Sequence, residues 1–399
     1  MRIVFLGGFY PKERYEEIAK RSKYLGFAAN ELQLNILRGF DSLGYSMNAI
    51  TTPTTKKLKG LVFKGSTFSH NGKTLDHCIG FIDIVGLKHI HTFYKIKNTL
   101  QKHFNKIDYI FIYSLQSSRL GAAYFHKKAN PETKIILIVT DLPQYMNDTD
   151  NRLYKILKSL EIKIENKFLE AVDKFVFLSD YMKEKISLKG KPYIVMEGIY
   201  NYNDGVQPNK LYNIRTDEDI STILYTGTID RRFGVINLIK AFHTLKNERY
   251  NLIIAGDGDS KSEIEYFSAI DSRVKYLGVL DRNKILELQQ ISDLLVNPRT
   301  PEGEYVKYSF PSKTMEYFAS GTPTLMYRLP GVPKEYYDYC YTISDLGLET
   351  LAKEIQHILA KPKTELKEMG DKARNFILTK KNPHVQCDNI LKFMKDEPV

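Results

Sequence analysis

The residues best suited to chemistry lie between Tyr308 and Pro323. Pro311 can begin a helix, because its missing N–H would be unpaired there anyway, and Gly321 can end it. The free amides and the positive end of such a helix attract an anion such as a diphosphate. Glu316 follows about one turn later, where a carboxylate can accept hydrogen bonds from a ribose diol. The pattern predicts a nucleoside diphosphate site; a short capped helix without a ligand is the alternative.

A second stretch, residues 224–242, reads as a strand, a glycine turn and a helix. Gly227 follows the strand, and the adjacent Arg231 and Arg232 precede the helix. A nucleoside diphosphate gains negative charge as it leaves a sugar, and a positioned cation stabilises that charge. We assign this role to Arg232, with Lys313 as a second candidate. A solvated pair of surface arginines is the alternative.

Both stretches resemble the family-four retaining glycosyltransferases of the GT-B fold. The segment F-P-S-K-x-x-E-Y-x-A-S-G, which begins at Phe310, is similar to the donor-binding signature of that family, with Glu316 as the ribose-binding glutamate. The chain departs from the family pattern at Tyr308, where the family has its other glutamate. It departs again at Thr228 and Phe233, where the family has cations. The resemblance implies a nucleotide-sugar donor, and the departures bear on how its sugar and phosphates are recognised.

The resemblance also implies roles for residues in the first half of the chain. Two glycines, Gly7 and Gly8, end a strand and let backbone approach a ligand, and Asp141 ends another strand after Thr140, near which the family often has a histidine. A plain tight turn and a turn-capping aspartate are the alternatives. Glu302 or Glu304 could replace the missing glutamate. The expected catalytic residues are Asp141, Arg232 and Lys313; the expected donor-binding residues are Gly8, Gly227, Thr228, Arg231, Arg299, Phe310, Pro311, Ser312, Thr314 and Glu316; the expected acceptor-binding residues are Gly7, Tyr10 and Asn30.

Short apolar strands that alternate with helical stretches must position these residues. Near-continuous apolar runs are typical of parallel strands covered on both faces. We therefore expect an α/β protein of the GT-B architecture, with two Rossmann-like doubly wound domains that face each other across a cleft. The predicted strands are 2–6, 108–114, 134–140, 174–178 and 193–196, then 222–225, 251–255, 274–277, 293–296 and 324–327; the clearest helices are 28–43, 150–172 and 371–395 with a break at Pro383. The expected organisation is an acceptor-binding domain 1–200, a polar linker 201–218, a donor-binding domain 219–375, and a helix 376–399 that packs back on the first domain.

Length and composition fit two soluble domains. The chain has 399 residues, of which 43% are hydrophobic and 26% charged, and this is typical of globular proteins. Its three distant cysteines and nine scattered histidines lack the spacing of a disulfide framework or a zinc site. The first strand begins too early for a signal peptide, and no apolar run approaches the roughly 18 residues of a membrane span. We expect a cytoplasmic protein without a metal or cofactor, apart from the nucleotide-sugar substrate.

The net charge of +11 belongs to the first half of the chain. Residues 1–200 contain 31 Lys and Arg against 19 Asp and Glu, whereas residues 201–399 contain 27 against 28. Such a basic excess suits an anionic membrane surface or a nucleic acid, and a merely solubilising surface is the alternative. Aromatic residues interleaved with arginines, as in a nucleic-acid groove, are not evident. We therefore expect contact with the inner face of the plasma membrane and no nucleic acid.

These expectations combine into one function. They describe a retaining, metal-independent glycosyltransferase that moves a sugar from a nucleotide-sugar to a glycan or a lipid-linked acceptor in cell-surface polysaccharide or glycoconjugate synthesis. The resemblance favours a UDP-sugar over a GDP-sugar. One alternative is a catalytically silent GT-B subunit that binds or stabilises an active partner. Another keeps the fold but changes the reaction to nucleotide-sugar epimerisation or phosphorolysis.

Overall fold

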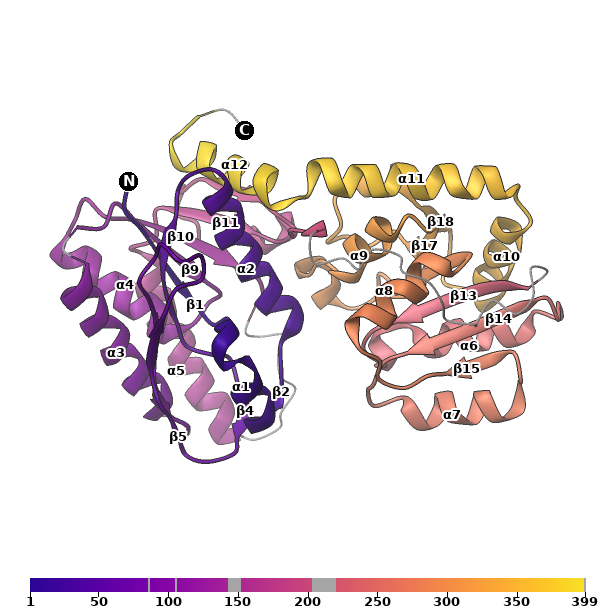
Figure 1. The fold of residues 1–399 in the computed structure, drawn as a ribbon, viewed down its shortest axis with the longest axis horizontal. Helices are drawn as coiled ribbons and strands as arrows, with labels where there is room; N and C mark the ends of the chain where they lie inside the picture. Colours follow the sequence, from indigo (N-terminus) through magenta and orange to yellow (C-terminus); the bar gives the residue numbers. More distant parts are fainter. Residues whose placement is uncertain (85–86, 105, 143–151, 203–219, 398–399) are drawn as a thin grey trace. The chain divides into compact units, whose positions relative to one another are not determined.

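The computed structural model describes residues 1–399 apart from 85–86, 105, 143–151, 203–219 and 398–399. The chain divides into two compact units (Figure 1): unit 1 comprises Met1–Ile199 with Pro383–Val399, and unit 2 comprises Tyr200–Asn382. The expected linker 201–218 lies outside the described residues from 203 onward. The chain returns to unit 1 at Pro383 and not at residue 376, because the preceding helix continues to Lys380 and Pro383 begins the next.

Unit 1 is built on an eight-stranded sheet in the order β12-β11-β10-β9-β1-β3-β7-β6. Its neighbouring strands are parallel except β6 and β7, which are antiparallel. The central strands are the predicted apolar runs, and they are buried on both faces. The strands are β1 (Ile3–Gly7), β3 (Met47–Thr51), β6 (Ser66–Phe68), β7 (Asp76–Cys78), β9 (Tyr109–Tyr113), β10 (Lys134–Val139), β11 (Lys174–Phe177) and β12 (Tyr193–Val195); two small antiparallel pairs join β2 (Ser22–Tyr24) with β4 (Lys56–Leu58) and β5 (Val62–Phe63) with β8 (Phe81–Ile82).

Strand β3 was not among the predicted strands, although it lies inside the sheet between β1 and β7. Its five residues include Asn48 and Thr51, so they form no continuous apolar run. The fold supplies distant partners for both. Asn48 accepts a hydrogen bond from the amide of Leu75 at 3.3 Å, and the Thr51 hydroxyl donates to the carbonyl of Phe9 at 2.7 Å. This strand is therefore defined by tertiary partners and not by its own periodicity.

Helices cover the sheet of unit 1, and the last of them comes from the C-terminal end of the chain. Helix α12 lies along α2 (Figure 1), where Cys387, Ile390, Leu391 and Met394 join the core beneath the sheet. A Cβ atom at Gly39 of α2 would lie only 2.3 Å from the Cys387 sulfur, so the two helices pack closely there. The helices of unit 1 are α1 (Tyr15–Arg21), α2 (Phe27–Ser42), α3 (Leu87–His103), α4 (Ser117–Ala129), α5 (Arg152–Leu169) and α12 (Pro383–Met394), with short 3-10 turns η1 (Lys12–Arg14) and η3 (Asp180–Glu184).

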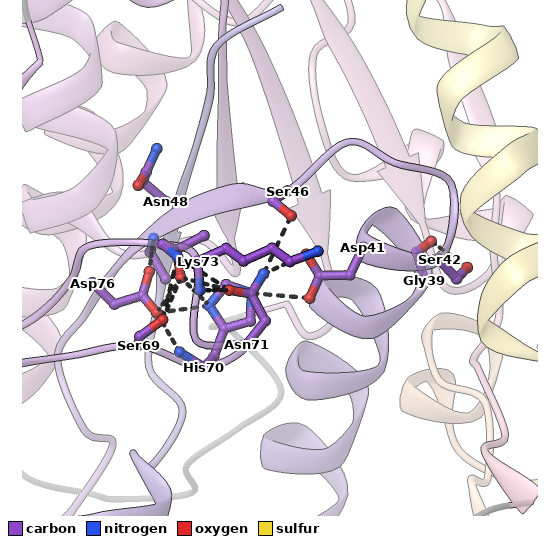
Figure 2. Close-up of polar contacts among 12 residues, drawn as sticks. Gly39, Asp41, Ser42, Ser46, Asn48, Ser69, His70, Asn71, Lys73 and Asp76 are labelled. Carbon is purple, nitrogen blue, oxygen red and sulfur yellow. Dashed lines mark hydrogen bonds and ion pairs between the residues drawn. The ribbon is translucent and has the colours of Figure 1, made fainter.

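A buried ion cluster holds the turn before β7 against α2 (Figure 2). The Nδ1 atom of His70 lies 2.7 Å from the Asp76 carboxylate, and its Nε2 atom lies 3.2 Å from that of Asp41. Asp76 also accepts the amide of Ala49 at 2.8 Å. Burial opposes the charge on His70, but the hydrogen bonds to Asp41 and Asp76 prevail and raise its pKa to about 9. The charged imidazole thus joins α2, β3 and the 69–76 turn.

Unit 2 is built on a six-stranded parallel sheet in the order β15-β14-β13-β16-β17-β18. Side chains along β13 alternate between the faces: Ile223 and Tyr225 pack with α6 and α10, whereas Leu224 packs with Leu288 of α8. The strands are β13 (Ser221–Thr226), β14 (Tyr250–Ala255), β15 (Val274–Tyr276), β16 (Leu294–Asn297), β17 (Thr324–Tyr327) and β18 (Tyr341–Ile343); the helices are α6 (Val235–Thr244), α7 (Lys261–Ile270), α8 (Arg282–Ile291), α9 (Lys313–Ser320), α10 (Leu348–Leu359) and α11 (Lys363–Lys380), with 3-10 turns η5 (Arg231–Phe233), η6 (Glu304–Tyr308) and η7 (Lys334–Tyr339).

Each unit therefore has the doubly wound α/β architecture that the alternation of strands and helices predicts. Within the part of the chain that the structure describes, no helix has the length and apolar character needed to cross a membrane.

Candidate functional site

Two glycines bring adjacent strand ends of unit 2 into backbone contact. Gly227 follows β13 with φ +127°, and its amide donates to the carbonyl of Ala255 at 2.9 Å. Gly256 follows β14 with φ +148°, and a Cβ atom there would lie 1.8 Å from the Gly227 carbonyl oxygen. Only glycine fits such a backbone conformation and such a contact. The turn after β13 is thereby held at the carboxyl edge of the sheet, where doubly wound folds bind ligands.

A third glycine draws the end of β16 toward the same turn. Gly234 separates η5 from α6 with φ +76°, and a Cβ atom there would lie 2.0 Å from the carbonyl oxygen of Pro298. Arg299 follows directly after Pro298, so its side chain is delivered to the carboxyl edge of the sheet.

The predicted signature helix is α9, which begins at Lys313 after Pro311 and Ser312 and ends at Gly321. Gly321 takes the left-handed conformation at φ +80°, as the predicted C-terminal cap requires. The hydroxyl of Tyr317, which lies in α9, accepts a hydrogen bond from the backbone amide of Thr226 at 2.8 Å. This bond fixes α9 to the end of β13, so the N-terminus of α9 and the Gly227 turn belong to one site.

Lys313 is the buried cation of this site. Its Nζ atom is buried and has no hydrogen-bond partner among the described residues, and it lies 4.0 Å from the centre of the Tyr225 ring. A Cβ atom at Gly227 would be 2.8 Å from it. Burial disfavours the charged ammonium and lowers the pKa of Lys313 to about 7, a shift that Glu316 opposes and Arg299 favours. A buried amine without a partner that faces a glycine turn is suited to receive an anion.

Arg299 is the second buried cation. Its guanidinium lies between the rings of Phe233 and Tyr305, 5.5 and 5.1 Å from their centres, and it donates to the Ser309 hydroxyl at 2.7 Å. Its Nε atom is buried without a hydrogen-bond partner among the residues that the structure describes. Burial lowers the pKa of Arg299 as well. The departure at Phe233 thus places a ring against Arg299 where a family member would carry a cation.

Arg231 and Arg232 are instead paired at the surface. Arg231 forms an ion pair with Glu263, and the Arg232 side chain, which is 62% exposed, contacts Asp230 with its Nε atom 3.0 Å from that carboxylate. The hydrogen bonds from Arg232 lower the pKa of Asp230, and those to Asp230 raise the pKa of Arg232. Neither predicted arginine is unpaired, so Lys313 and Arg299 are the better placed cations for a phosphate.

Glu316 lies within α9 and is oriented by two residues of α8. Its Oε1 atom accepts from Gln289 at 2.7 Å, and its Oε2 atom lies 3.7 Å from Arg282. Gln289 is fully buried and also donates to the Thr226 hydroxyl at 3.1 Å. Neither α8 residue was predicted from the sequence, since only the packing of α8 against α9 brings them to Glu316. The Glu316 side chain stays partly accessible to solvent.

The other predicted donor residues of unit 2 divide into exposed and core positions. Thr228 and Ser312 are exposed, and the Thr228 carbonyl accepts from Tyr225 at 2.7 Å. Thr314 is buried, 3.4 Å from the Asn297 amide, and Phe310 packs on Tyr336 with ring centres 5.2 Å apart. Phe310 and Thr314 therefore belong to the buried core that supports the site.

Tyr308 is buried where the family has its other glutamate. Its hydroxyl lies 3.4 Å from a carboxylate oxygen of Glu304. Glu302 lies 3.4 Å from the Thr300 hydroxyl, and both glutamates are exposed. Glu302 and Glu304, which could replace the missing glutamate, thus lie exposed in the segment between β16 and α9.

In unit 1 the Gly7–Gly8 loop is closely packed by side chains. The Gly8 amide donates to Gln33 at 2.6 Å, and a Cβ atom at Gly8 would lie 2.4 Å from Arg119 Nη2. The buried Arg119 donates to the carbonyl of Tyr113 at 2.9 Å, and burial lowers its pKa to about 10. Gln33 and Arg119 were not among the predicted site residues, although a lone arginine among the small and apolar residues 117–123 is a local signal for a buried functional group.

Tyr10 and Asn30 use their polar groups within unit 1. The Asn30 side chain accepts the Tyr10 amide at 2.8 Å, and the Tyr10 hydroxyl donates to the carbonyl of Thr54 at 2.8 Å. Both side chains are buried. The structure thus gives them a structural role beside the Gly7–Gly8 loop and shows no free polar atom on Tyr10 for an acceptor.

Asp141 follows β10 and its side chain is exposed at the carboxyl edge of the unit 1 sheet. Asp141 lies near Tyr113, at the end of β9. Burial of the Tyr113 hydroxyl raises its pKa, and the negative charge of Asp141 raises it further. The remainder of the predicted motif, from Pro143, lies outside the described residues. Among the residues described, no group of three or more His, Cys, Asp and Glu side chains could hold a metal ion.

Comparisons with known proteins agree with this arrangement. Residues 208–376 match the family described as glycosyl transferases group 1. No match was found among curated protein sequences. Sucrose-phosphate synthase from Thermosynechococcus elongatus is similar in structure, with a TM-score of 0.69 at 15% identity over 99% of both chains.

Two further solved structures have the same fold. Alr3699/HepE from Anabaena, in complex with UDP, has a TM-score of 0.66 at 12% identity over 99% of this chain and 100% of that one. The lipopolysaccharide outer core galactosyltransferase WaaB, in its apo form, has a TM-score of 0.64 at 15% identity over 99% of both chains. This chain therefore has the GT-B fold, and residues 208–376, which make up most of its second unit, match the family model of the group 1 glycosyl transferases.

Proposed function

We propose that this protein is a glycosyltransferase that binds a nucleotide-sugar in unit 2 and transfers its sugar to an acceptor hydroxyl. The observation that carries the proposal is the buried amine of Lys313, which has no hydrogen-bond partner among the described residues and faces the Gly227 turn at the N-terminal end of α9. Structural lysines of a folded core have partners, because an unpaired buried amine costs stability. A diphosphate in this position would supply the missing partner.

The proposed roles follow from the contacts. Lys313, Arg299 and the positive N-terminal end of α9 bind the diphosphate, and Glu316, oriented by Gln289, accepts hydrogen bonds from the ribose hydroxyls. We propose uridine as the base, in line with the UDP complex of Alr3699/HepE. The two buried cations would carry the charge that a divalent metal balances elsewhere, so the proposed reaction is independent of metal.

The proposed reaction retains the anomeric configuration. The acceptor oxygen bonds to the anomeric carbon on the face that the diphosphate leaves, the bond from that carbon to the phosphate oxygen breaks, and the acceptor proton passes to the departing phosphate. The developing charge would be stabilised by Lys313 and Arg299. Asp141 would orient the acceptor or the donor sugar. A glycan or a lipid-linked sugar of the cell surface is the proposed acceptor class.

A catalytically silent subunit is the second candidate, and Tyr308 favours it. A buried phenol replaces the carboxylate that would read the donor sugar, with Glu302 and Glu304 exposed nearby. Such a protein would bind the nucleotide and stabilise a partner without transferring sugar.

The test is a panel of UDP-, GDP- and ADP-sugars, scored by thermal shift and by release of the nucleoside diphosphate. We expect a UDP-sugar to raise the melting temperature of the wild type, since a ligand that binds only the folded state stabilises it. Glu316→Gln should weaken UDP binding about tenfold to a hundredfold, because it removes hydrogen bonds to a charged group.

Glu349→Gln is the matched control, because Glu349 lies on α10 of the same unit with 86% of its side chain exposed. Its UDP affinity should equal that of the wild type. UDP binding without turnover on any acceptor would favour the silent subunit. A wild type that no nucleotide stabilises would refute the proposed function.

A further inference from the structure

Helix α3 of unit 1 presents apolar side chains to solvent. Leu87, Ile90 and Tyr94 are 53%, 57% and 57% exposed, and their spacing of three and four residues places them on one face. Leu61 and Val62, which are also exposed, lie on the β5–β8 ribbon beside the helix. We refer to these five residues as the α3 surface. Single exposed apolar side chains need no explanation, but a row of them on one helix does.

Lysines flank this apolar row on both sides. At about 3.6 residues per turn, Lys88 and Lys95 fall on one side of the row and Lys97 on the other. The Lys88 Nζ atom forms an ion pair with the Asp83 carboxylate at 2.7 Å and lies 4.3 Å from the centre of the Phe81 ring. Lys88 therefore also connects α3 to the ribbon. The helix contains no acidic residue. An apolar face bordered by cations is the pattern of helices that lie in a membrane interface.

The segment around the α3 surface is also strongly basic. Residues 42–107 contain ten lysines and two aspartates, a net charge of +8 out of the +12 of the first half of the chain. Both aspartates are already engaged: Asp76 contacts His70 in the buried cluster, and Asp83 contacts Lys88. The sequence of this segment is therefore strongly basic, and anionic lipids attract a segment of this charge.

A cavity adjoins the α3 surface. Its volume is about 570 Å³, within the range of roughly 300–1,000 Å³ typical of ligand pockets. The stacked rings of Phe63 and Phe81 contribute to its wall, and their centres are 5.1 Å apart. Its lining is largely apolar where the ribbon forms it and polar where α3 forms it: Val62, Phe63, Phe81 and Ile82 from the ribbon, His91 and Lys95 from α3. A hydrocarbon chain with an anionic headgroup has this distribution of polarity.

We propose that the α3 surface docks on an anionic lipid bilayer, with its apolar side chains among the headgroups and acyl chains and its lysines at the lipid phosphates. A protein partner fits less well, because lysine is depleted at protein interfaces. A nucleic acid fits less well too, because a row of Leu, Ile and Val has no role on a phosphate backbone. Docking would bring unit 1 to a lipid-linked acceptor; that consequence rests on the proposed function, whereas the docking itself does not.

The experiment is vesicle flotation of the full-length protein, with vesicles of phosphatidylcholine alone and of phosphatidylcholine mixed with phosphatidylglycerol. We expect binding to the mixed vesicles, weaker as salt is added because the lysine contribution is screened. The double variant Ile90→Glu/Tyr94→Glu should bind about tenfold less or weaker, since it places two charges in the apolar layer. Lys95→Glu/Lys97→Glu should lose at least about fivefold for each lysine removed.

The matched control is Tyr266→Glu/Val279→Glu in unit 2, whose side chains are 60% and 73% exposed. It adds the same charge at equally exposed apolar sites and should bind like the wild type. The proposal is overturned if the Ile90/Tyr94 variant binds like the control, if the wild type binds neither vesicle, or if binding to neutral vesicles at high salt equals that to the anionic ones.

The UDP thermal shift of every variant separates this proposal from the proposed function. All four α3 substitutions are on exposed or half-buried side chains, so we expect them to leave the shift unchanged. Loss of vesicle binding with the UDP shift intact shows that the surface acts as proposed. Vesicle binding by a wild type that shows no UDP shift would refute the nucleotide site and leave the docking surface standing.

Discussion

The Lys313 ammonium makes the nucleotide site dependent on pH. With a pKa of about 7 in the free protein, the side chain is half neutral at neutral pH, whereas bound to a diphosphate it must be charged. Binding above pH 7 therefore takes up a proton. Below pH 7 the lysine is already charged and the affinity should change little on its account.

We predict that the dissociation constant of UDP rises up to about tenfold for each pH unit above 7. Calorimetry over this range, in two buffers of different ionisation enthalpy, measures both the affinity and the proton uptake. Lys313→Met should bind UDP more weakly and without the proton uptake. Lys372→Met, on the exposed side of α11, is the control and should titrate like the wild type. Equal proton uptake in both variants would mean that another group is responsible.

How much of this site can be predicted from the sequence depends on how far apart along the chain the contacting residues lie. Lys313 and Glu316 stand in one helix, so a local motif reveals them. Gln289 orients Glu316 from another helix, and nothing in its local sequence indicates that contact. Arg232 shows the reverse case. Its partner Asp230 is only two residues away, yet the pattern of a glycine turn with two arginines suggested a phosphate contact.

At the scale of elements, the turns at the carboxyl edge of the unit 2 sheet hold the site together. Gly234 and Gly278 offer a comparison, because both have a left-handed backbone, at φ +76° and +65°. A Cβ atom at Gly278 would meet nothing within 4 Å, whereas at Gly234 it would lie 2.0 Å from the carbonyl oxygen of Pro298. The two positions therefore separate backbone strain from loss of packing.

We predict that Gly278→Ala lowers the free energy of unfolding by about 1–2 kcal/mol, the cost of the left-handed conformation alone. Gly234→Ala should cost roughly 1–3 kcal/mol more, because the loop that carries Arg299 must move. Urea unfolding of the two variants measures the difference. UDP binding should weaken in Gly234→Ala only. If both variants lost the same free energy of unfolding, the loop after Pro298 would move without a cost in free energy.

The strands show which elements a sequence can predict. In unit 2 the five predicted strands correspond to β13–β17. Four of them contain a buried apolar run, whereas in β15 only Val274 is buried. The edge strand β18 (Tyr341–Ile343) has only three residues and was missed. So were β3 and the small strands between residues 56 and 82, which are short and take their order from distant partners. The strands and the helix that carry the α3 surface were thus not predicted from the sequence, although their lysines contributed to the predicted basic charge.

For the molecule as a whole, the chain leaves unit 1 at Ile199 and returns to it at Pro383. Consecutive helices therefore stabilise different units. Ile377 of α11 is fully buried in the core of unit 2, and Ile390 of α12 is fully buried in the core of unit 1. They are thirteen positions apart along the chain, so their positions in the sequence would not assign them to different cores.

We predict that truncation of these two isoleucines lowers the stability of different units. Loss of a buried isoleucine side chain costs about 2–5 kcal/mol, a transfer term plus a cavity term. Calorimetric unfolding with and without UDP identifies the unit 2 transition, because the proposed ligand raises only that melting temperature. Ile377→Ala should lower the UDP-sensitive transition, and Ile390→Ala should lower the other while leaving the UDP shift intact. If both variants lowered a single shared transition, the two units would unfold together, and α12 would be a cooperative link between the cores and not merely a part of unit 1.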